Sequence, residues 1–211
     1  MAIKRTSDIV FIESTIHAVA EIGIENTRTK DVAEHAGFSE ASMFRRFPSK
    51  EILLRESFLY VDRQISDILT RNVSFRNLDG VPCELAMYAI WHKVYRYLIE
   101  HREETIFYIR YRYSSLYTDE VRNSCQAYNG TFDTAYELHE KKVSKASSTD
   151  WGIIFSSINE MTLGFAEKVI TGTIKDSPET EESIWTAVST ALSAFSRLMT
   201  EKAAITDTVL C

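Results

Sequence analysis

The side chains between Ser39 and Lys50 have the types and the spacing that suit contact with DNA. Ser39 is expected to cap a helix over roughly residues 40 to 46, because its hydroxyl can accept from amides that lack a partner in the first turn. Met43 and Phe47 would then face inward. The residues left on or near the exposed surface are Glu40, Ala41, Ser42, Phe44, Arg45 and Arg46. Short polar groups in front suit base contact, and arginines behind them suit phosphate contact.

A short helix and a turn are predicted to position these side chains. Thr29 is expected to be the N-cap of a helix whose inner face carries Val32, Ala33 and Ala36, and Gly37 then supplies a turn. Pro48-Ser49 reads as a stop followed by a cap, so that Lys50 begins the next helix. A preceding helix over residues 9 to 23 should complete a small three-helix bundle and end at its glycine. The pattern therefore predicts a helix-turn-helix.

These motifs resemble the DNA-binding signature of the TetR family of transcriptional regulators. The matching segments are IVFIESTIHAVAEIG at residues 9 to 23, NTRTKDVAEHAG at 26 to 37, the aromatic pair Phe44 and Phe47, and Ser49-Lys50-Glu51. The match runs over roughly the first 60 residues. Phe44 stands where the family usually has tyrosine, so one phosphate contact is missing. Glu40 stands where lysine or another polar residue is common, which affects the operator sequence.

Together, the pattern and the resemblance assign roles to individual residues. We expect Thr27, Thr29 and Lys50 to hold phosphates, and Phe44 to make an apolar contact with a thymine methyl group or the backbone. Candidates for base edges are Glu40, Ala41, Ser42 and Arg45. The predicted DNA-binding residues are Thr27, Thr29, Ser39, Glu40, Ala41, Ser42, Phe44, Arg45, Arg46 and Lys50.

Composition favours an all-α fold for the chain of 211 residues. It is 45% apolar, with only three prolines and seven glycines between long segments of helical period. No signal-peptide pattern and no run of membrane-spanning length is seen, so a cytoplasmic protein is expected. Three widely spaced cysteines fit a reducing compartment and inert thiols. A net charge of -6 argues against indiscriminate nucleic-acid binding but allows a local basic patch around the motif.

Beyond the motif, the pattern predicts a helical bundle in a second domain. We place the DNA-binding domain at residues 1–50, and an effector-binding and dimerisation domain at 51–211. A loop is expected over residues 73 to 82. Helices are expected over residues 49–72, 83–101, 119–145, 150–174 and 178–202, with Thr149 or Asp150 capping the fourth.

The last two predicted helices carry more apolar and small surface than one face requires. A homodimer with a four-helix interface is the expected solution, and the family resemblance implies the same arrangement. The alternative is that these faces form intramolecular core alone. The candidate interface residues are Ile158, Phe165, Val188, Ala191 and Phe195.

Aromatic residues on several predicted helices favour a small-molecule pocket, although most such rings simply form core. The resemblance implies that some of them surround an effector. Arg96, Arg110 and Arg112 could anchor an anionic end of that effector, or point to solvent. The candidate pocket residues are Trp91, Tyr95, Phe107, Tyr111, Tyr128, Phe132 and Phe155.

Catalysis is not indicated by any motif. The five histidines show no metal-ligand spacing, and neither a phosphate-binding glycine loop nor a nucleophile elbow is present, so we expect no metal or other cofactor. His101 and Glu104 are one helical turn apart, a spacing that surface ion pairs commonly have. The expected function is a ligand-responsive, DNA-binding regulator, most simply a repressor. A DNA-bound adaptor that recruits a protein partner, and an enzyme with an unrecognised site, remain alternatives.

Overall fold

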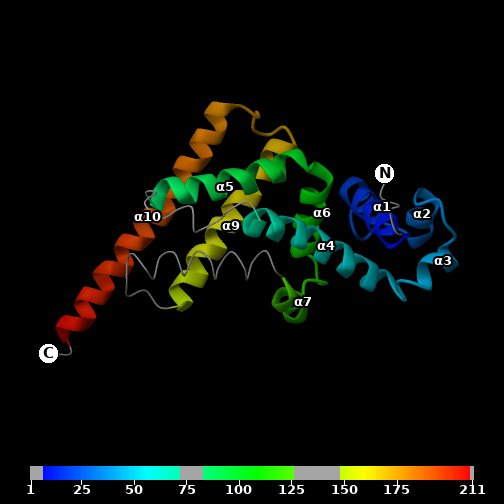
Figure 1. Cartoon of the computed structure of the whole chain (residues 1–211), viewed down its shortest axis with the longest axis horizontal. Helices are drawn as coiled ribbons and strands as arrows, with labels where there is room; N and C mark the ends of the chain where they lie inside the picture. The colour runs from blue at the N-terminus through cyan, green and yellow to red at the C-terminus, as the bar shows by residue number, and fades with distance from the viewer. Residues whose placement is uncertain (1–6, 72–82, 126–147, 210–211) are drawn as a thin grey trace. The chain divides into compact units, whose positions relative to one another are not determined.

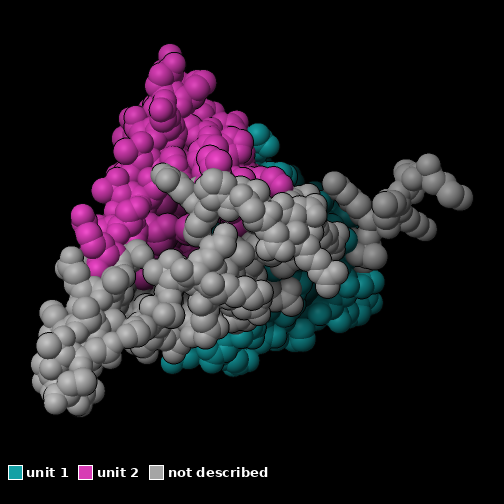
Figure 2. Space-filling model, turned by 60° about the vertical axis from the view of Figure 1, so that its left-hand side comes forward, with its two compact units in different colours: residues 1–68, 100–127 teal, residues 69–99, 128–211 magenta. Residues whose placement is uncertain are grey.

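The computed structural model describes residues 7–71, 83–125 and 148–209, and within these ranges it is helical (Figure 1). The chain forms two compact units, one of residues 1–68 and 100–127 and the other of residues 69–99 and 128–211 (Figure 2). We call them unit 1 and unit 2. The predicted all-α class is confirmed.

Unit 1 begins with three helices, α1 (Ser7–Ile22), α2 (Thr29–His35) and α3 (Glu40–Phe44). The long α4 (Lys50–Arg71) follows, and α6 (Arg102–Arg112) and α7 (Asp119–Ser124) complete the unit. Helix α1 packs along α6, as Figure 1 shows. The guanidinium of Arg110 on α6 donates to the carbonyls of Val19 and Ala20, and so satisfies acceptors in the last turn of α1.

Aromatic rings from α4 and α6 form the core of unit 1. Phe58 is fully buried and stacks on Tyr108 and Tyr111, with ring centroids 4.7 and 4.5 Å away. The hydroxyl of Tyr108 donates to the buried carboxylate of Asp62 at 3.2 Å. Burial, and then the neighbouring carboxylate, raise the pKa of Tyr108 well above its usual value, so the ring remains a neutral donor.

Unit 2 contains α5 (Cys83–Glu100), α9 (Ser148–Ile170) and α10 (Pro178–Val209), and α9 packs against α10 (Figure 1). The indole nitrogen of Trp91 on α5 donates to the Thr162 hydroxyl on α9 at 3.1 Å. Its ring stacks on Tyr95 at 4.9 Å, and both rings are buried. None of the helices that the structure describes is long and apolar enough to cross a membrane.

Several helix ends differ from the sequence prediction. Helix α7 ends at Ser124 instead of running to 145, because Cys125 takes an extended conformation with ψ of 121°. Helix α9 ends at Ile170 instead of 174, where Gly172 has a left-handed φ of 77° and the Ile174 amide turns back to the Lys168 carbonyl. It begins at Ser148, and α10 continues to Val209, seven residues past the expected end. The predicted loop at 73–82 and the rest of the predicted helix beyond 125 lie outside the described residues.

Cys125 is the cysteine whose side chain lies within the described region. Its thiol is buried and donates to the Val121 carbonyl at 3.3 Å. Burial raises the pKa of this thiol to about 11. Since the thiolate is the reactive form, these surroundings suit an inert cysteine.

Candidate nucleic-acid interface

Helices α2 and α3 meet through a tight turn that Gly37 makes possible. Its φ of 77° lies in the left-handed region, which a residue with a Cβ atom rarely enters. The Gly37 amide donates to the Glu34 carbonyl at 3.0 Å, and the Phe38 amide donates to the Ala33 carbonyl at 2.9 Å. These bonds close the C-terminal end of α2 and set the direction in which α3 leaves it.

Apolar side chains fix the inner face of this pair of helices. Val32 and Ala33 on α2 and Met43 on α3 are buried, as predicted, and so is Phe47 just beyond α3. The ring of Phe11 on α1 lies 5.1 Å from that of Phe38 and 6.3 Å from that of Phe47. Ala36 is only half-buried. The three N-terminal helices therefore share one small core, which holds α3 in place.

The start of α3 agrees with the sequence prediction, whereas the start of α2 differs from it. Ser39 caps α3 as expected, with its hydroxyl accepting from the Ser42 amide at 3.2 Å. The N-cap of α2, however, is Arg28, and Thr29 is the first residue of that helix. The Thr29 hydroxyl does not cap α2, because Thr29 is already helical and Arg28 is the extended residue before the helix. The hydroxyl instead donates to the carboxylate of Glu40 at 2.5 Å. This bond joins the first turns of α2 and α3 directly.

The outer face of α3 presents a small group of exposed side chains. Ala41, Phe44, Arg45 and Arg46 are exposed, and Ser42 is half-buried. The Arg45 guanidinium donates to the Ser42 hydroxyl at 3.3 Å, and that of Arg46 donates to Asp8 on α1 at 2.5 Å. Helix α3 ends at Phe44 rather than 46, because the amides of Arg46 and Phe47 both turn back to the Met43 carbonyl.

Like Thr29, which bonds Glu40, the other two residues expected to hold phosphates have internal partners. Thr27 is buried, and its hydroxyl donates to the Gly23 carbonyl at 2.7 Å. The Lys50 ammonium donates to the Ile24 carbonyl at 2.7 Å, although an ammonium has three N–H donors and this bond uses one. Both bonds brace the segment between α1 and α2. The phosphate-binding roles of Thr27, Thr29 and Lys50 stay predictions.

A pair of stacked histidines, which no sequence motif marks, ties α2 to the rest of unit 1. The rings of His17 and His35 stack at 4.9 Å, and His35 also bonds the Ser14 hydroxyl at 3.1 Å. His17 lies 2.9 Å from the Glu103 carboxylate on α6. The residues in these contacts are up to 86 positions apart in the sequence, so no local pattern signals them.

The N-terminal helices are similar to a known protein family. Residues 11–56 match the family model described as bacterial regulatory proteins, tetR family. The TetR-family resemblance is confirmed. The matched residues span α1, α2, α3 and the start of α4, which are the elements described above.

Solved structures extend the similarity in fold to most of the chain. A TetR family transcription regulator from Marinobacter aquaeolei VT8 is 22% identical with a TM-score of 0.70, covering 88% of this chain and 94% of that one. A putative tetR family transcription regulator from Shewanella sp. PV-4 is 18% identical with a TM-score of 0.72, covering 92% of this chain and 98% of that one. The fatty acid degradation regulator FadR from Bacillus halodurans is 13% identical with a TM-score of 0.67, covering 92% of this chain and 96% of that one. No curated protein matches. The chain thus has the fold of a TetR-family transcription regulator.

Within this TetR fold, the predicted effector-pocket residues lie in different units. Phe107 and Tyr111 are buried in unit 1, whereas Trp91 and Tyr95 are buried in unit 2, where Phe155 is half-buried. Burial raises the pKa of Tyr95 and that of Tyr111 to about 12. Tyr128 and Phe132 lie outside the described residues. The shared pocket therefore stays a prediction.

The three candidate anchor arginines have partners inside their own units. Arg96 donates to Asp176 at 3.3 Å, and Arg110 donates to the end of α1 as described above. The Arg112 guanidinium lies 5.5 Å from the centre of the Tyr117 ring. The His101 Nδ1 atom lies 3.6 Å from the Glu104 carboxylate, the ordinary contact expected at this spacing. Among the described residues, no group of three or more His, Cys, Asp or Glu is placed to hold a metal ion.

The candidate dimer-interface residues differ in exposure. Ala191 on α10 is exposed, and Ile158 and Phe165 on α9 are half-buried. Val188 is only 1% exposed, which places it in the core of unit 2 and counts against a direct role in an interface. The side chain of Phe195 lies outside the described region.

Proposed function

We propose that this protein is a sequence-specific, DNA-binding transcriptional regulator that acts as a homodimer and leaves its operator when it binds a small effector. The observation that carries the proposal is the outer face of α3, where Ala41, Phe44 and Arg45 are exposed on a helix held by a buried core. A helix presented in this way can enter the major groove. A regulator that an effector releases from its operator acts as a repressor. We place this repressor in the cytoplasm.

The geometry supports different roles for the side chains of α3 and its flanking residues in contact with DNA. Arg45 is steered along the helix by the Ser42 hydroxyl, so its guanidinium is placed to donate to a base edge or a phosphate. Phe44 is 40% exposed and offers an apolar edge to a thymine methyl group. Lys50 has N–H donors left for a phosphate, and Arg46 and Ser39 lie at the two ends of the helix. In this proposal, residues 1–50 form the DNA-binding domain, and residues 51–211 form the domain that binds the effector and the second copy of the chain.

Selection of bound fragments from random DNA tests this function. The full chain should enrich a site with two-fold symmetry, whose half-sites lie about one helical turn or a little more apart. A panel of metabolites is then screened for release of the selected DNA. The absence of any enriched sequence would overturn specific binding, and an enriched site that no compound releases would favour the adaptor.

Glu40 is expected to affect base preference more than affinity. Its carboxylate can accept from cytosine N4 but repels phosphate, and it also holds the Thr29 hydroxyl at 2.5 Å. Glu40→Ala should relax the preference at one operator position, and leave or raise the affinity for unrelated DNA. The measurement is the base profile selected by each protein. Glu34→Ala, which removes an exposed acid on α2, is the matched control. Identical profiles for Glu40→Ala and the wild type would make Glu40 a structural residue only.

The proposed homodimer uses α9 and α10. Exposed and half-buried small or apolar side chains on these helices, such as Ala191, Ile158 and Phe165, leave a surface that a second copy can cover. A dimer is needed because one short α3 contacts only one half-site, whereas two copies read a symmetric operator.

Ala191→Arg should therefore produce monomers. A guanidinium without a partner at a closely packed interface costs several kcal/mol in desolvation. We expect a native-like helical spectrum, a halved mass in sedimentation, and little operator binding. Ala89→Arg places the same charge on an exposed alanine of α5 and should leave the dimer intact. A dimeric Ala191→Arg protein would move the interface away from this face.

A further inference from the structure

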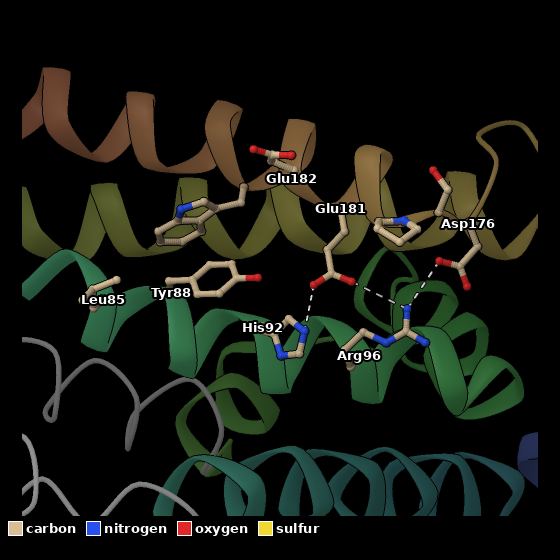
Figure 3. A pocket seen from close by; sticks show the side chains of 10 residues that line it. Leu85, Tyr88, His92, Arg96, Asp176, Glu181 and Glu182 are labelled. Carbon is tan, nitrogen blue, oxygen red and sulfur yellow. Dashed lines mark hydrogen bonds and ion pairs between the residues drawn. The ribbon is translucent and has the colours of Figure 1, made fainter.

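A groove in unit 2 lies between α5 and the first turns of α10 (Figure 3). Its volume is about 830 Å³, within the range that small-molecule sites occupy. One end is apolar, with Leu85 exposed and Tyr88 beside it, and the other carries Arg96 and Asp176. Glu182 and Trp185 of α10 also line it.

The apolar end is built from aromatic rings in fixed mutual positions. The Trp185 ring lies 5.3 Å from that of Tyr88, at 65°, and 5.3 Å from that of Trp91. Trp91 is held by its hydrogen bond to Thr162 and by stacking on Tyr95. Tyr88 and Trp185 are themselves half-buried, so parts of their rings remain open to the groove. Ring faces of this kind attract cations, tryptophan most strongly.

The charged end is acidic on balance. The lining contains the carboxylates of Asp176, Glu181 and Glu182 against the single guanidinium of Arg96. Arg96 lies 3.3 Å from Asp176 and 3.7 Å from Glu181, and Glu181 also lies 2.8 Å from His92. Glu182 is exposed, and its carboxylate has no hydrogen bond or ion pair with any residue in the described parts of the chain. Within the described residues, the Glu182 carboxylate in the groove lining therefore has no cationic partner.

We propose that this groove binds a lipophilic organic cation, with its apolar body against Tyr88 and Trp185 and its charge facing the Glu182 carboxylate. An anion would meet the excess of carboxylates, and a neutral ligand would gain no attraction from the Glu182 carboxylate. A bare metal ion fits poorly, because Asp176 and Glu181 already bond Arg96 and His92. The inference rests on the proposed effector-responsive function and names the chemical class of the effector.

Two probes of the same shape and opposite charge test the groove directly. The full chain is titrated by calorimetry with tetraphenylphosphonium and, separately, with tetraphenylborate. The cation should bind at least about tenfold more tightly than the anion, since both bury similar apolar area and only the cation is attracted by the rings and by Glu182. Equal affinities, or no binding of the cation, would overturn the proposal.

Variants then locate the bound cation. Glu182→Gln should weaken tetraphenylphosphonium binding by up to about fivefold, the upper range for the loss of one exposed charge. Trp185→Ala should weaken it about tenfold or more, and Trp185→Phe, which keeps a ring, should weaken it less. Glu167→Gln removes an exposed acid of α9 outside the groove and should change nothing. Affinity unchanged in Glu182→Gln and in Trp185→Phe would place the cation elsewhere and overturn the site.

A parallel assay separates this inference from the proposed function. Tetraphenylphosphonium is added to the protein bound to its selected operator, and the fraction of DNA released is measured. Release that is lost in Glu182→Gln supports both the site and the effector response. Binding in the groove without release supports the site and counts against control of DNA binding by its ligand.

Discussion

Arg45→Ala is expected to weaken operator binding roughly 5- to 150-fold, which corresponds to about 1 to 3 kcal/mol. The guanidinium is exposed on the outer face of α3 and its direction is set by Ser42. Its removal takes away charge-assisted hydrogen bonds to the DNA and leaves the core around Met43 untouched. The measurement is a titration of labelled operator at fixed salt, since phosphate contacts make affinity depend strongly on salt.

Two further variants show whether Arg45 reads bases or only phosphates. Lys50→Ala should reduce binding to operator and unrelated DNA almost equally, whereas Arg45→Ala should reduce operator binding more. Arg63→Ala removes an exposed cation of α4 beyond the motif and serves as the control for charge alone. Wild-type affinity in both Arg45→Ala and Lys50→Ala, with folding intact, would refute the DNA-binding assignment of α3.

Phe58→Ala is expected to cost about 3 to 5 kcal/mol in the free energy of unfolding, the range found for a buried aromatic side chain reduced to alanine. Phe58 is fully buried and its ring stacks on both Tyr108 and Tyr111. The substitution removes apolar contact and leaves a cavity between α4 and α6. Chemical denaturation followed by circular dichroism measures the change.

The comparison that interprets this loss is Phe58→Leu. Leucine retains most of the buried apolar volume but cannot stack, so the loss should be smaller than that for alanine. Leu59→Ala, which changes a half-buried neighbour on α4, should also cost less. A loss below about 1 kcal/mol for Phe58→Ala would show that α4 and α6 do not share this core.

The helix-turn-helix could be predicted from sequence because its determinants are local. Ser39 caps α3 within three residues, Gly37 adopts the left-handed conformation that the turn requires, and Met43 and Phe47 face inward at helical spacing. The all-α class follows from the same short-range periodicity. Interactions between residues a few positions apart can be predicted from the spacing of residue types in the sequence.

Helix ends were predicted less well, because a few local bonds compete at each end. The sequence pattern favours Thr29 as a cap, but Arg28 is the extended residue before α2, and the Thr29 hydroxyl donates to the carboxylate of Glu40, 11 positions away. The sequence pattern of α9 continued past Ile170, but a glycine with φ of 77° and a returning amide ended the helix there. Periodicity indicates which face is apolar, and it does not decide which of several partners a polar group chooses.

By itself, then, the sequence determined the helical class, the DNA-binding motif and the residues on the outer face of α3. Only the tertiary structure decided which aromatic rings share a core. Phe107 and Tyr111 are buried in unit 1, and Trp91 and Tyr95 are buried in unit 2. It also decided that Tyr88, Trp185 and Glu182 face one groove. Tyr88 lies about a hundred positions from Glu182 and Trp185 in the sequence, and such pairings depend on how helices pack, which no local spacing encodes.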